Sequence, residues 1–453
     1  MGHVQFTLRS GHALDHVPAH LDCLAGSGRP AGRFDNGALD RVFSRHGGGG
    51  ARASCVFHAR RGFGRPGAQH VGFDDREEAL GLSRTYRAQI ADPAHSDDVV
   101  NALRDLAQVE SACVQTFALA PWAESMAATV AGEEALKHSN LPHEQIRVPQ
   151  AHALERGDER VTVAIVDTGV VIGHPEFQRK CLAGYDTVDI GMGHVGDKLT
   201  LVGDSRGHDY NPYDDVGHGC HVAGIIGAQG WRIPRGVAGR ALVLPLRVLA
   251  AAIQAGGARP LGVGALPDID AGMKVAIDLG AAVINMSFGT SESQVDPDGP
   301  LPHLAVVRYA MSAGCTLVAA AGNSGQREKY YPAALPEVIC VAAVDAQDRR
   351  ASFSTTGDHV CVSAPGVGIV SVGRRGYQVN SGTSFAAPFV AGVAALVLAR
   401  ARRLGHEMNG LKVKALLQAT ARRIGAAFSE ETGHGVVDAL AAVQRAGLQG
   451  ETR

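Results

Sequence analysis

Between residues 151 and 447, short apolar runs rich in β-branched residues alternate with longer stretches whose apolar positions recur every three to four residues. The short runs predict buried strands, and the longer stretches predict helices. This alternation predicts an α/β fold in three layers, with a mostly parallel central sheet flanked by helices. Strands are expected at 161–166, 241–249, 283–286, 316–320 and 338–344, and helices at 218–228, 269–279, 302–313, 384–402 and 410–421.

The chain before residue 151 lacks this alternation and is interpreted as a small N-terminal extension. Residues 1–73 are rich in Gly, His and Arg and show little apolar periodicity, so we expect them to be loop-rich or disordered. Residues 74–120 predict a small α+β segment, with a strand at 85–90, a helix capped by Ser96 and a strand at 109–117. Residues 121–150 contain three prolines and are interpreted as a linker, and residues 448–453 as a tail.

The charge balance limits the classes of partner. The 43 basic and 45 acidic residues give a formal net charge of −2, so no overall field favours nucleic acid or an anionic membrane. The apolar stretches at 241–253 and 385–399 are shorter than a bilayer span and are interpreted as core. We therefore expect neither a nucleic-acid nor a membrane partner.

The compartment is predicted from the start of the chain and from its cysteines. The first residues lack the basic and apolar pattern of a secretory signal, which predicts a cytoplasmic protein, while export with a misassigned start stays open. The eight cysteines form no C-x-x-C pair and no zinc-finger spacing. Free thiols in a reducing compartment are expected, and pairing in an oxidising one is the alternative.

Three polar residues are expected at one edge of the predicted sheet. Asp167 ends the run 161–166, and the carboxyl ends of parallel strands form the edge that carries sites. His218 begins an apolar helix, and Ser384 begins the longest one, where the helix dipole is positive. Acyl transfer needs a nucleophile, a base and a group that orients the base. Ser384, His218 and Asp167 are the candidates for these three roles.

The stretches around these residues resemble the three signatures of the subtilisin-like serine proteases (subtilases, peptidase family S8). They are Val163–Gly169, His218–Gly224 and Gly382–Pro388, and they lie in that family's order, Asp, His, Ser. The resemblance implies a subtilisin-like fold and a serine endopeptidase (EC 3.4.21) that hydrolyses protein or peptide substrates through an acyl-enzyme on Ser384. It also implies that Asn323, within 319–325, donates to the oxyanion together with the N–H of Ser384.

The same resemblance implies where a substrate binds. Ser287 and Gly289 would line one wall of the S1 pocket, with Gly322 on the opposite wall. Gly264, within 262–265, would lie on an edge that pairs with an extended substrate. An ordinary turn is the alternative for each glycine. Tyr330 is expected either to narrow the S1 pocket or to point to solvent.

No cofactor is expected, and no metal is expected among the site residues. Many subtilases bind a tight calcium ion at the loop that corresponds to residues 229–235. Here this loop has no carboxylate and no asparagine but two arginines, which makes it a poor calcium site. We expect the tight calcium site to be absent, although Glu176 matches a usual ligand position.

Two other functions fit the sequence less well than an endopeptidase does. A catalytically idle subtilase-like scaffold that only binds peptides would be expected to lack one of the four catalytic residues, and all four are present. An α/β-hydrolase esterase would need a Gly-x-Ser-x-Gly elbow and the order Ser, acid, His, and Ser384 fits neither requirement.

Two segments outside the motifs bear on regulation and specificity. Residues 74–120 resemble the second half of the inhibitory propeptides of subtilases, so intramolecular inhibition is expected, and an unrelated appendage is the alternative. The insertion at 186–213 is interpreted as a passive surface loop, with a lid or a substrate-selecting loop as the alternative.

Overall fold

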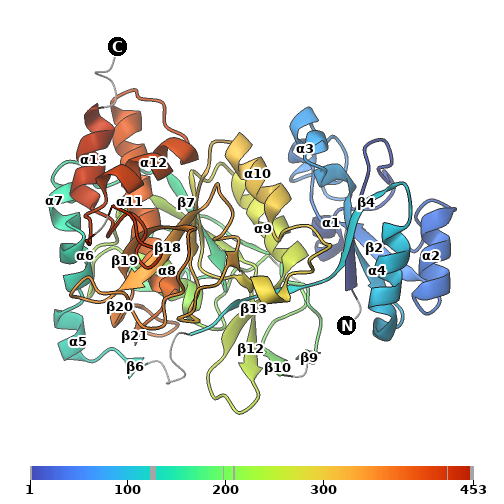
Figure 1. Ribbon diagram of the computed structural model, residues 1–453, viewed down its shortest axis with the longest axis horizontal. Coiled ribbons are helices and arrows are strands. Elements are labelled where there is room, and N and C mark those ends of the chain that lie inside the picture. The colour runs from blue at the N-terminus through green and yellow to red at the C-terminus, as the bar shows by residue number, and fades with distance from the viewer. Residues whose placement is uncertain (1–2, 123–128, 197, 208–209, 426, 449–453) are drawn as a thin grey trace.

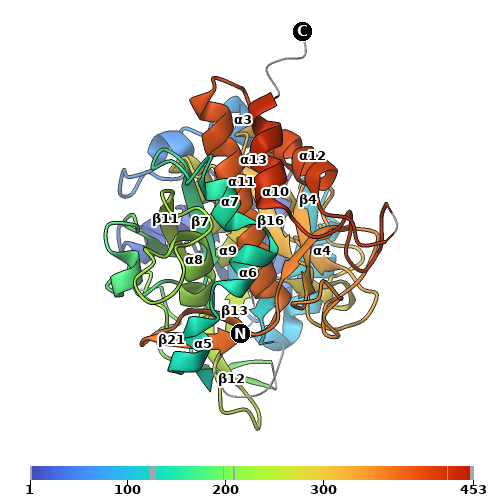
Figure 2. The same ribbon diagram turned by 90° about the vertical axis from the view of Figure 1, so that its left-hand side faces the viewer.

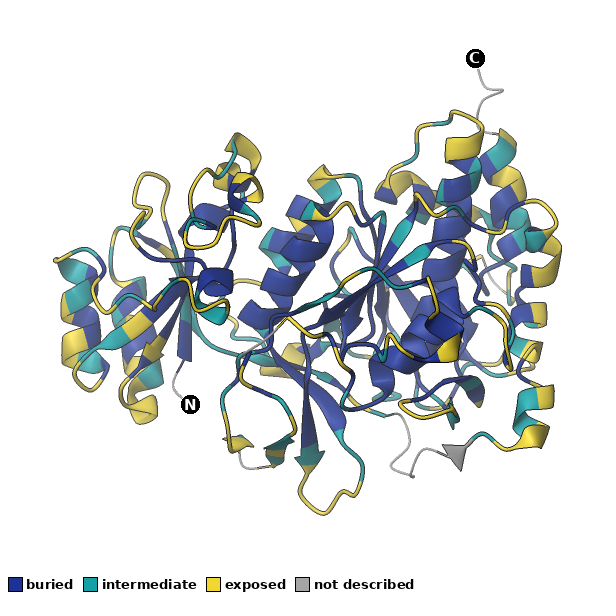
Figure 3. Cartoon of the chain, turned by 180° about the vertical axis from the view of Figure 1, so that it is seen from behind, coloured by how far each residue is buried: buried dark blue, intermediate teal, exposed yellow. Residues whose placement is uncertain are grey.

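The computed structural model describes residues 3–122, 129–196, 198–207, 210–425 and 427–448. These residues form a small N-terminal domain at one end of the molecule and a larger α/β domain that makes up the rest (Figure 1). Each domain has its own cluster of buried apolar side chains, and the strands and central helices of the larger domain are almost wholly buried (Figure 3).

The larger domain is built around a parallel sheet of seven strands in the order β19-β18-β16-β14-β7-β11-β8. Helices cover both faces of this sheet, so its strands appear in the sequence as continuous apolar runs. The predicted strands at 283–286 and 316–320 have the observed bounds, and the other three differ by one or two residues at an end. The strands are β7 (Thr162–Asp167), β8 (Tyr185–Asp186), β11 (Leu242–Arg247), β14 (Val283–Met286), β16 (Thr316–Ala320), β18 (Ile339–Val344) and β19 (Val360–Pro365).

Helices pack on the two sides of the sheet, as the prediction of a three-layer α/β fold requires (Figure 1). One side holds α8 (His218–Gly227), α11 (Thr383–Arg403), α12 (Gly410–Thr420) and α13 (Ala439–Leu448), and the other holds α9 (Leu266–Asp278) and α10 (Leu304–Ser312). In the described part of the chain, α11 is the one helix long and apolar enough to cross a membrane, but 89% of its apolar window is buried inside the fold. The predicted fold class is confirmed.

The N-terminal domain contradicts the prediction that residues 1–73 are loop-rich or disordered. It contains an antiparallel sheet in the order β2-β3-β1-β4, and two of its strands come from those residues. The apolar side chains that form its core are spread thinly among glycines, histidines and arginines, so their alternation is weak in the sequence. Its main elements are β1 (His3–Leu8), α2 (Ala38–His46), β2 (Ala51–Cys55), β3 (Thr85–Ile90), α4 (Ser96–Arg104) and β4 (Val109–Val114), with the shorter α1 (His20–Leu24) and α3 (Asp75–Ala79).

The interpretation of residues 121–150 as a linker is wrong for their second half. Residues 133–152 form α5 (Glu133–Lys137), α6 (Leu141–Gln145) and α7 (Val148–His152), which lie along the side of the larger domain (Figure 2). Ile146, Val148 and Ala151 are buried in the core of that domain, and α7 packs against α13. The three prolines predicted irregular chain, yet Pro142 and Pro149 lie in the first turns of α6 and α7, where proline is tolerated. Residues 123–128 lie outside the described part.

A second, antiparallel sheet shows that residues 186–213, interpreted as a passive surface loop, are not a loop throughout. Its order is β5-β13-β12-β10-β9, and β9 (His194–Val195) and β10 (Leu199–Val202) come from the insertion. The insertion therefore extends a sheet formed with β12 (Ala250–Gln254) and β13 (Leu261–Ala265). The fifth strand, β5 (Phe117–Ala120), comes from the N-terminal extension. The strand predicted at 109–117 is thus two strands, β4 and β5.

Buried charges join the N-terminal domain to α9. Lys274 is fully buried, and its ammonium group lies 2.5 Å from Glu77 and 2.6 Å from Asp278. The ring of His58 binds Asp278 at 2.8 Å. Burial lowers the pKa of His58 below its ordinary value, and the hydrogen bond to Asp278 opposes this shift. Each carboxylate has a cationic or ring nitrogen partner, as buried charge requires.

Candidate active site

Asp167 and His218 meet at the carboxyl edge of the parallel sheet. Asp167 is the last residue of β7, His218 is the first of α8, and both are fully buried. Their side chains are joined by a bond of 2.8 Å between His218 Nδ1 and Asp167 Oδ1. Because that bond fixes the proton on Nδ1, the other ring nitrogen is available as a base. In the described part of the chain, His218 Nε2 has no hydrogen-bond partner.

Asp214 fixes the start of the helix that carries His218. Its buried carboxylate accepts hydrogen bonds from the backbone N–H groups of Val216, Gly217 and Cys220 at 2.7–2.9 Å. It also accepts one from the hydroxyl of Thr168, the residue after Asp167, at 2.8 Å. Burial raises the pKa of Asp214 above its ordinary value, and these bonds oppose the shift. One carboxylate thus ties together the two chain segments that carry Asp167 and His218.

The helix α8 can approach the Asp167 loop closely because Gly219 has no side chain. A Cβ at this position would collide with the carbonyl oxygen of Gly169. The backbone N–H of Gly219 donates to the Thr168 hydroxyl at 2.9 Å. Cys220, the next residue, is fully buried, and burial raises the pKa of its thiol well above the ordinary value. This thiol therefore stays protonated and is not a competing nucleophile.

Ser384 is the second residue of α11 and is nearly buried. Its hydroxyl donates to the carbonyl of Ser287 at 3.2 Å, and Ser287 Oγ donates to the carbonyl of Ser384 at 2.8 Å. The ring of Phe385, the next residue, packs 5.3 Å from the ring of His218 between centroids. The serine and the histidine therefore lie in one cluster, although the hydroxyl is turned toward Ser287.

Asn323 lies beside the first turn of α11. Its side-chain oxygen accepts hydrogen bonds from the backbone N–H and the hydroxyl of Thr383, both at 2.9 Å. This pairing leaves the amide NH₂ of Asn323 as a donor for another group. The N–H of Ser384, in the first turn of the helix, also lacks an acceptor within the helix. Two donors thus lie at the first turn of α11, which carries Ser384.

A cavity of about 400 Å³ opens in front of Ser384 and Asn323. The structure brings three predicted substrate-binding residues to its lining, namely Ser287, Gly289 and Gly322. Tyr330 also lines it, and a Cβ on Gly322 would collide with the Tyr330 ring. Of the two positions expected for Tyr330, the structure has the one at the pocket wall. Gly264, the fourth predicted residue, lies on β13 and not in this lining.

The chain's own strand β5 occupies the groove beside this cavity. It pairs antiparallel with β13, where Gly264 is opposite Ala118 and Gly262 is opposite Ala120. On its other side, Leu119 and Gly289 exchange two backbone hydrogen bonds of 3.0 Å. β5 is therefore held on both edges, between β13 and the segment that follows β14.

Trp122 covers His218. Its ring packs edge-on to His218, with 5.2 Å between centroids, and stacks on Phe385 at 6.0 Å. The guanidinium of Arg259 lies 3.0 Å from the centre of the Trp122 ring, and the indole N–H donates to the carbonyl of Pro260. These contacts explain why His218 has no exposed surface.

Glu176 lies under the loop at 229–235 and is fully buried. Its carboxylate accepts hydrogen bonds from the backbone N–H groups of Gly230, Trp231 and Arg232 at 2.8–3.1 Å. It also accepts one from the hydroxyl of Tyr377 at 3.0 Å. Hydrogen atoms thus point at both carboxylate oxygens from the side of the loop, and this donor set does not fit a calcium ion, which binds oxygen atoms.

Neither a metal-ligand cluster nor a disulfide is present among the described residues. No group of three or more His, Cys, Asp or Glu side chains there could hold a metal ion. All eight cysteines lie in the described ranges, and each is a free thiol.

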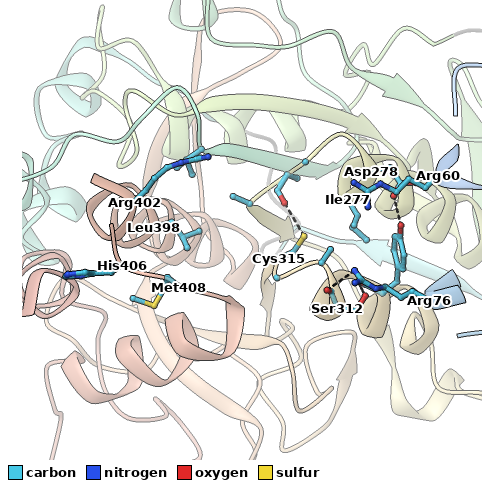
Figure 4. Close-up of a pocket in the computed structure, with 17 residues that line it drawn as sticks. Arg60, Arg76, Ile277, Asp278, Ser312, Cys315, Leu398, Arg402, His406 and Met408 are labelled. Carbon is cyan, nitrogen blue, oxygen red and sulfur yellow. Dashed lines mark hydrogen bonds between the residues drawn. The ribbon is translucent and has the colours of Figure 1, made fainter. Parts of the chain in front are cut away.

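Another pocket, of about 520 Å³, lies at the opposite edge of the parallel sheet (Figure 4). It is lined by residues that precede β7 and β14, by the ends of α9 and α11, and by Arg60 and Arg76 of the N-terminal domain. None of Asp167, His218, Asn323 and Ser384 lines it. The cavity in front of Ser384 is therefore the candidate active site.

The geometry agrees with the sequence comparisons. The family model of the subtilases (peptidase S8) matches residues 158–435 of the chain, which hold Asp167, His218, Asn323 and Ser384. The chain belongs to the subtilase family. Its class is accordingly that of the serine endopeptidases (EC 3.4.21).

Three relatives of this subtilase illustrate the extent of the similarity. The thermophilic serine proteinase of Bacillus sp. (strain AK1) is 38% identical over 274 residues, which are 59% of this chain and 58% of that protein. Thermitase of Thermoactinomyces vulgaris is 34% identical over 285 residues, 62% of this chain and 88% of thermitase. Subtilisin of Bacillus pumilus is 33% identical over 307 residues, 66% of this chain and 97% of that subtilisin.

Sequence patterns missed three residues of this subtilase's site: Asp214, Trp122 and Arg259. Asp214 could have been found, because it precedes His218 by four residues and can reach the start of the same helix. Trp122 and Arg259 carry no local signal. They meet because β5 pairs with β13, which is about 140 residues away in the chain.

Proposed function

We propose that this subtilase hydrolyses peptide bonds through an acyl-enzyme on Ser384, with His218 as general base and Asp167 orienting the imidazole. The observation that carries the proposal is the bond of 2.8 Å between two fully buried groups, His218 Nδ1 and Asp167 Oδ1. A carboxylate buried in this way stabilises the imidazolium that forms when the histidine takes a proton.

The reaction follows from these positions. When the Ser384 hydroxyl turns from the Ser287 carbonyl to His218 Nε2, it can give its proton to that nitrogen and attack the substrate carbonyl. The imidazolium then gives the proton to the leaving amine, and the acyl-enzyme forms. Water, activated by the same nitrogen, releases the acid and restores the serine.

Asn323 and the N–H of Ser384 stabilise the negative oxygen of the tetrahedral intermediate. The bonds from Thr383 to the Asn323 oxygen support this role, because they orient the amide before substrate arrives. Donors fixed in advance cost no reorganisation when the charge develops.

An active-site label tests the mechanism and separates it from an idle peptide-binding scaffold. A fluorophosphonate reacts with a serine only when that serine is activated by its base, so we expect one adduct per chain. Mass spectrometry of digested protein should locate the adduct on the peptide that contains Ser384. A folded protein that stays unlabelled even when β5 is loosened from the groove would support the idle scaffold.

The substrate binds as an extended strand in this proposal. Gly264 offers backbone groups on β13, Gly289 offers them on the opposite side, and Ser287 and Gly322 line the pocket for the side chain before the cut bond. The pairing of β5 with the same two edges supports this placement. Strand addition of this kind supplies affinity through main-chain hydrogen bonds.

The N-terminal extension inhibits the enzyme in the uncut chain. The predicted inhibitory segment, residues 74–120, ends in β5, which fills the groove that substrate needs. Trp122, directly after it, closes the space over His218. Inhibition therefore rests on a strand and a ring that occupy the substrate's path.

A proline in β5 tests this inhibition. Leu119→Pro removes the N–H that donates to Gly289 and should loosen β5, because a strand paired on both sides does not tolerate proline. We expect uncut protein to react with fluorophosphonate about tenfold faster than the wild type. Leu119→Val, which keeps the N–H, is the control. Equal labelling rates for both variants and the wild type would show that β5 does not block Ser384.

The loop at 229–235 is held without a tight calcium ion in this proposal, because Glu176 already binds the loop's N–H groups. Replacing Glu176 with Gln places an NH₂ against those donors and should lower the free energy of unfolding by about 2–4 kcal/mol. The exposed Glu134→Gln is the control. Calorimetry should give the same melting temperature for the wild type in calcium and in a chelator. A large rise with calcium would contradict the proposal.

A further inference from the structure

The side chains of β5 point alternately to two different surroundings. Ala118 and Ala120 are fully buried and belong to the core of the larger domain. Phe117 and Leu119 point to the other face of the antiparallel sheet, where they are only partly buried. A peptide in the position of β5 therefore meets one surface with its even positions and another with its odd positions.

The inner surface accepts only small side chains. A Cβ on Gly264 would lie 2.5 Å from the carbonyl oxygen of Val248, and one on Gly262 would lie 2.8 Å from the Thr168 side chain and 3.2 Å from the Ala120 Cβ. The sheet thus approaches the core closely where Ala118 and Ala120 enter it. A larger side chain at either position would have to displace packed atoms.

The outer surface is apolar and is extended by the insertion at 186–213. Leu119 is opposite Val263 on β13, and Val263 is opposite Ala250 on β12. Two strands farther across the same face, β10 and β9 of the insertion add further apolar side chains. The side chains that β9 and β10 add to this apolar face are Val195, Leu199 and Leu201.

A groove of about 940 Å³ runs over this face. Phe117 and Leu119 line it from β5, Leu199 lines it from the insertion, and Leu261 lines it from β13. The loop at 293–297 forms a further wall. The groove is large enough to hold several side chains of the size of leucine.

We propose that the insertion at 186–213 builds a specificity site for substrates, which binds the large apolar side chains at the two alternate positions held here by Phe117 and Leu119. The substrate class is an extended peptide with large apolar residues at these positions and small residues at those of Ala118 and Ala120. The occupant is argued from β5 itself, which is an extended segment seated on this surface. The proposal rests on the proposed function, because it takes β5 as the stand-in for a substrate.

Cleavage-site profiling tests the site without assuming which bond is cut. A mixed peptide library is digested with full-chain protein that carries Leu119→Pro, which loosens β5 from the groove, and the variants below are made in the same background. The active fraction is titrated with fluorophosphonate, and the cut sites are aligned by mass spectrometry. We expect large apolar residues to be enriched at two positions on the amino side of the cut, one residue apart. Small residues should be enriched at the positions that alternate with them, as Ala118 and Ala120 do in β5. Replacing Leu199 with Ser should reduce this apolar enrichment about tenfold.

Matched variants separate specificity from general damage. Thr200→Ser lies next to Leu199, on the exposed opposite side of β10, and should keep the profile of the Leu119→Pro protein. If Leu199→Ser does not fold, Leu201→Ser tests the same face, with fluorophosphonate labelling as the check on folding. Unchanged apolar enrichment in the folded leucine variant, or an equal loss in Thr200→Ser, would overturn the proposal. Absence of labelling and of any cleavage by the folded Leu119→Pro protein would instead defeat the proposed function.

Discussion

Replacing Ser384 with alanine is expected to lower kcat for peptide hydrolysis by about 10⁶-fold. The loss is this large because alanine has no hydroxyl group for His218 to activate. The Ser384 hydroxyl makes one hydrogen bond in the described structure, to the carbonyl of Ser287, so its removal should leave the fold intact. Steady-state cleavage of a quenched fluorogenic peptide measures the loss, and circular dichroism checks the fold.

Ser381→Ala is the matched control for this variant. Ser381 belongs to the same motif, but its hydroxyl accepts the N–H of Gly368 at 3.1 Å and has no bond to His218. Its replacement should change kcat by less than about threefold. A folded Ser384→Ala variant that keeps more than about one hundredth of wild-type activity would contradict the assignment of the nucleophile.

Replacing Asp167 with asparagine is expected to lower kcat by about 10⁴-fold. Asp167 Oδ1 accepts both the His218 ring N–H, at 2.8 Å, and the backbone N–H of Thr168, at 2.7 Å. An asparagine that keeps its oxygen at this position lacks the charge that stabilises the imidazolium. An asparagine that instead turns its NH₂ to this position donates to His218 Nδ1 and favours the other tautomer of the ring. The histidine would carry its proton on Nε2 and could not accept one from Ser384.

Asp215→Asn is the control for this charge change. Asp215 is close to the site in sequence, but its carboxylate is partly exposed and pairs with Arg247 at 3.5 Å. Initial rates across the pH range should show a near-normal profile for this variant and a uniformly low one for Asp167→Asn. A loss of less than about tenfold for Asp167→Asn would mean that the histidine does not depend on this carboxylate.

Asp167, His218 and Ser384 could be singled out from the sequence because each lies at the end of a strand or the start of a helix. A strand such as β7 is one continuous apolar run, so its end marks the sheet edge directly. The start of α11 is equally clear, since almost all residues that follow Ser384 are apolar. Local pattern and final position coincide in these elements.

The N-terminal domain could not be predicted in the same way. β2 consists of Ala51–Cys55, four small side chains and one arginine that give little apolar signal. Its place in the sheet is fixed by pairing with β3, more than 30 residues later. The short helices at 133–152 could not be predicted from the sequence for a related reason. α7 packs against α13, near the end of the chain, and α6 packs against α7, so their stability depends on tertiary contacts and not on a local amphipathic pattern.

The occupied groove also could not be foreseen, because the strand at 109–117 was predicted without a partner. Its second part, β5, bends away from β4 and joins a sheet of the other domain. The position of β5 depends on where β13 and the segment at Gly289 lie in the folded chain. Sequence could locate the edge at 262–265 but not the segment that covers it.

The pairing of β5 with β13 also bears on solubility. Without β5, residues Leu261–Ala265 would form the open border of a sheet, with unpaired N–H and C=O groups beside an apolar face. Such a border can pair with any extended chain, including one from a second molecule, and so promotes aggregation. A cleft that binds substrates as added strands must have an unpaired sheet edge, and this edge promotes aggregation whenever it is empty. While β5 stays in place, the border is capped, and newly made molecules are protected from one another.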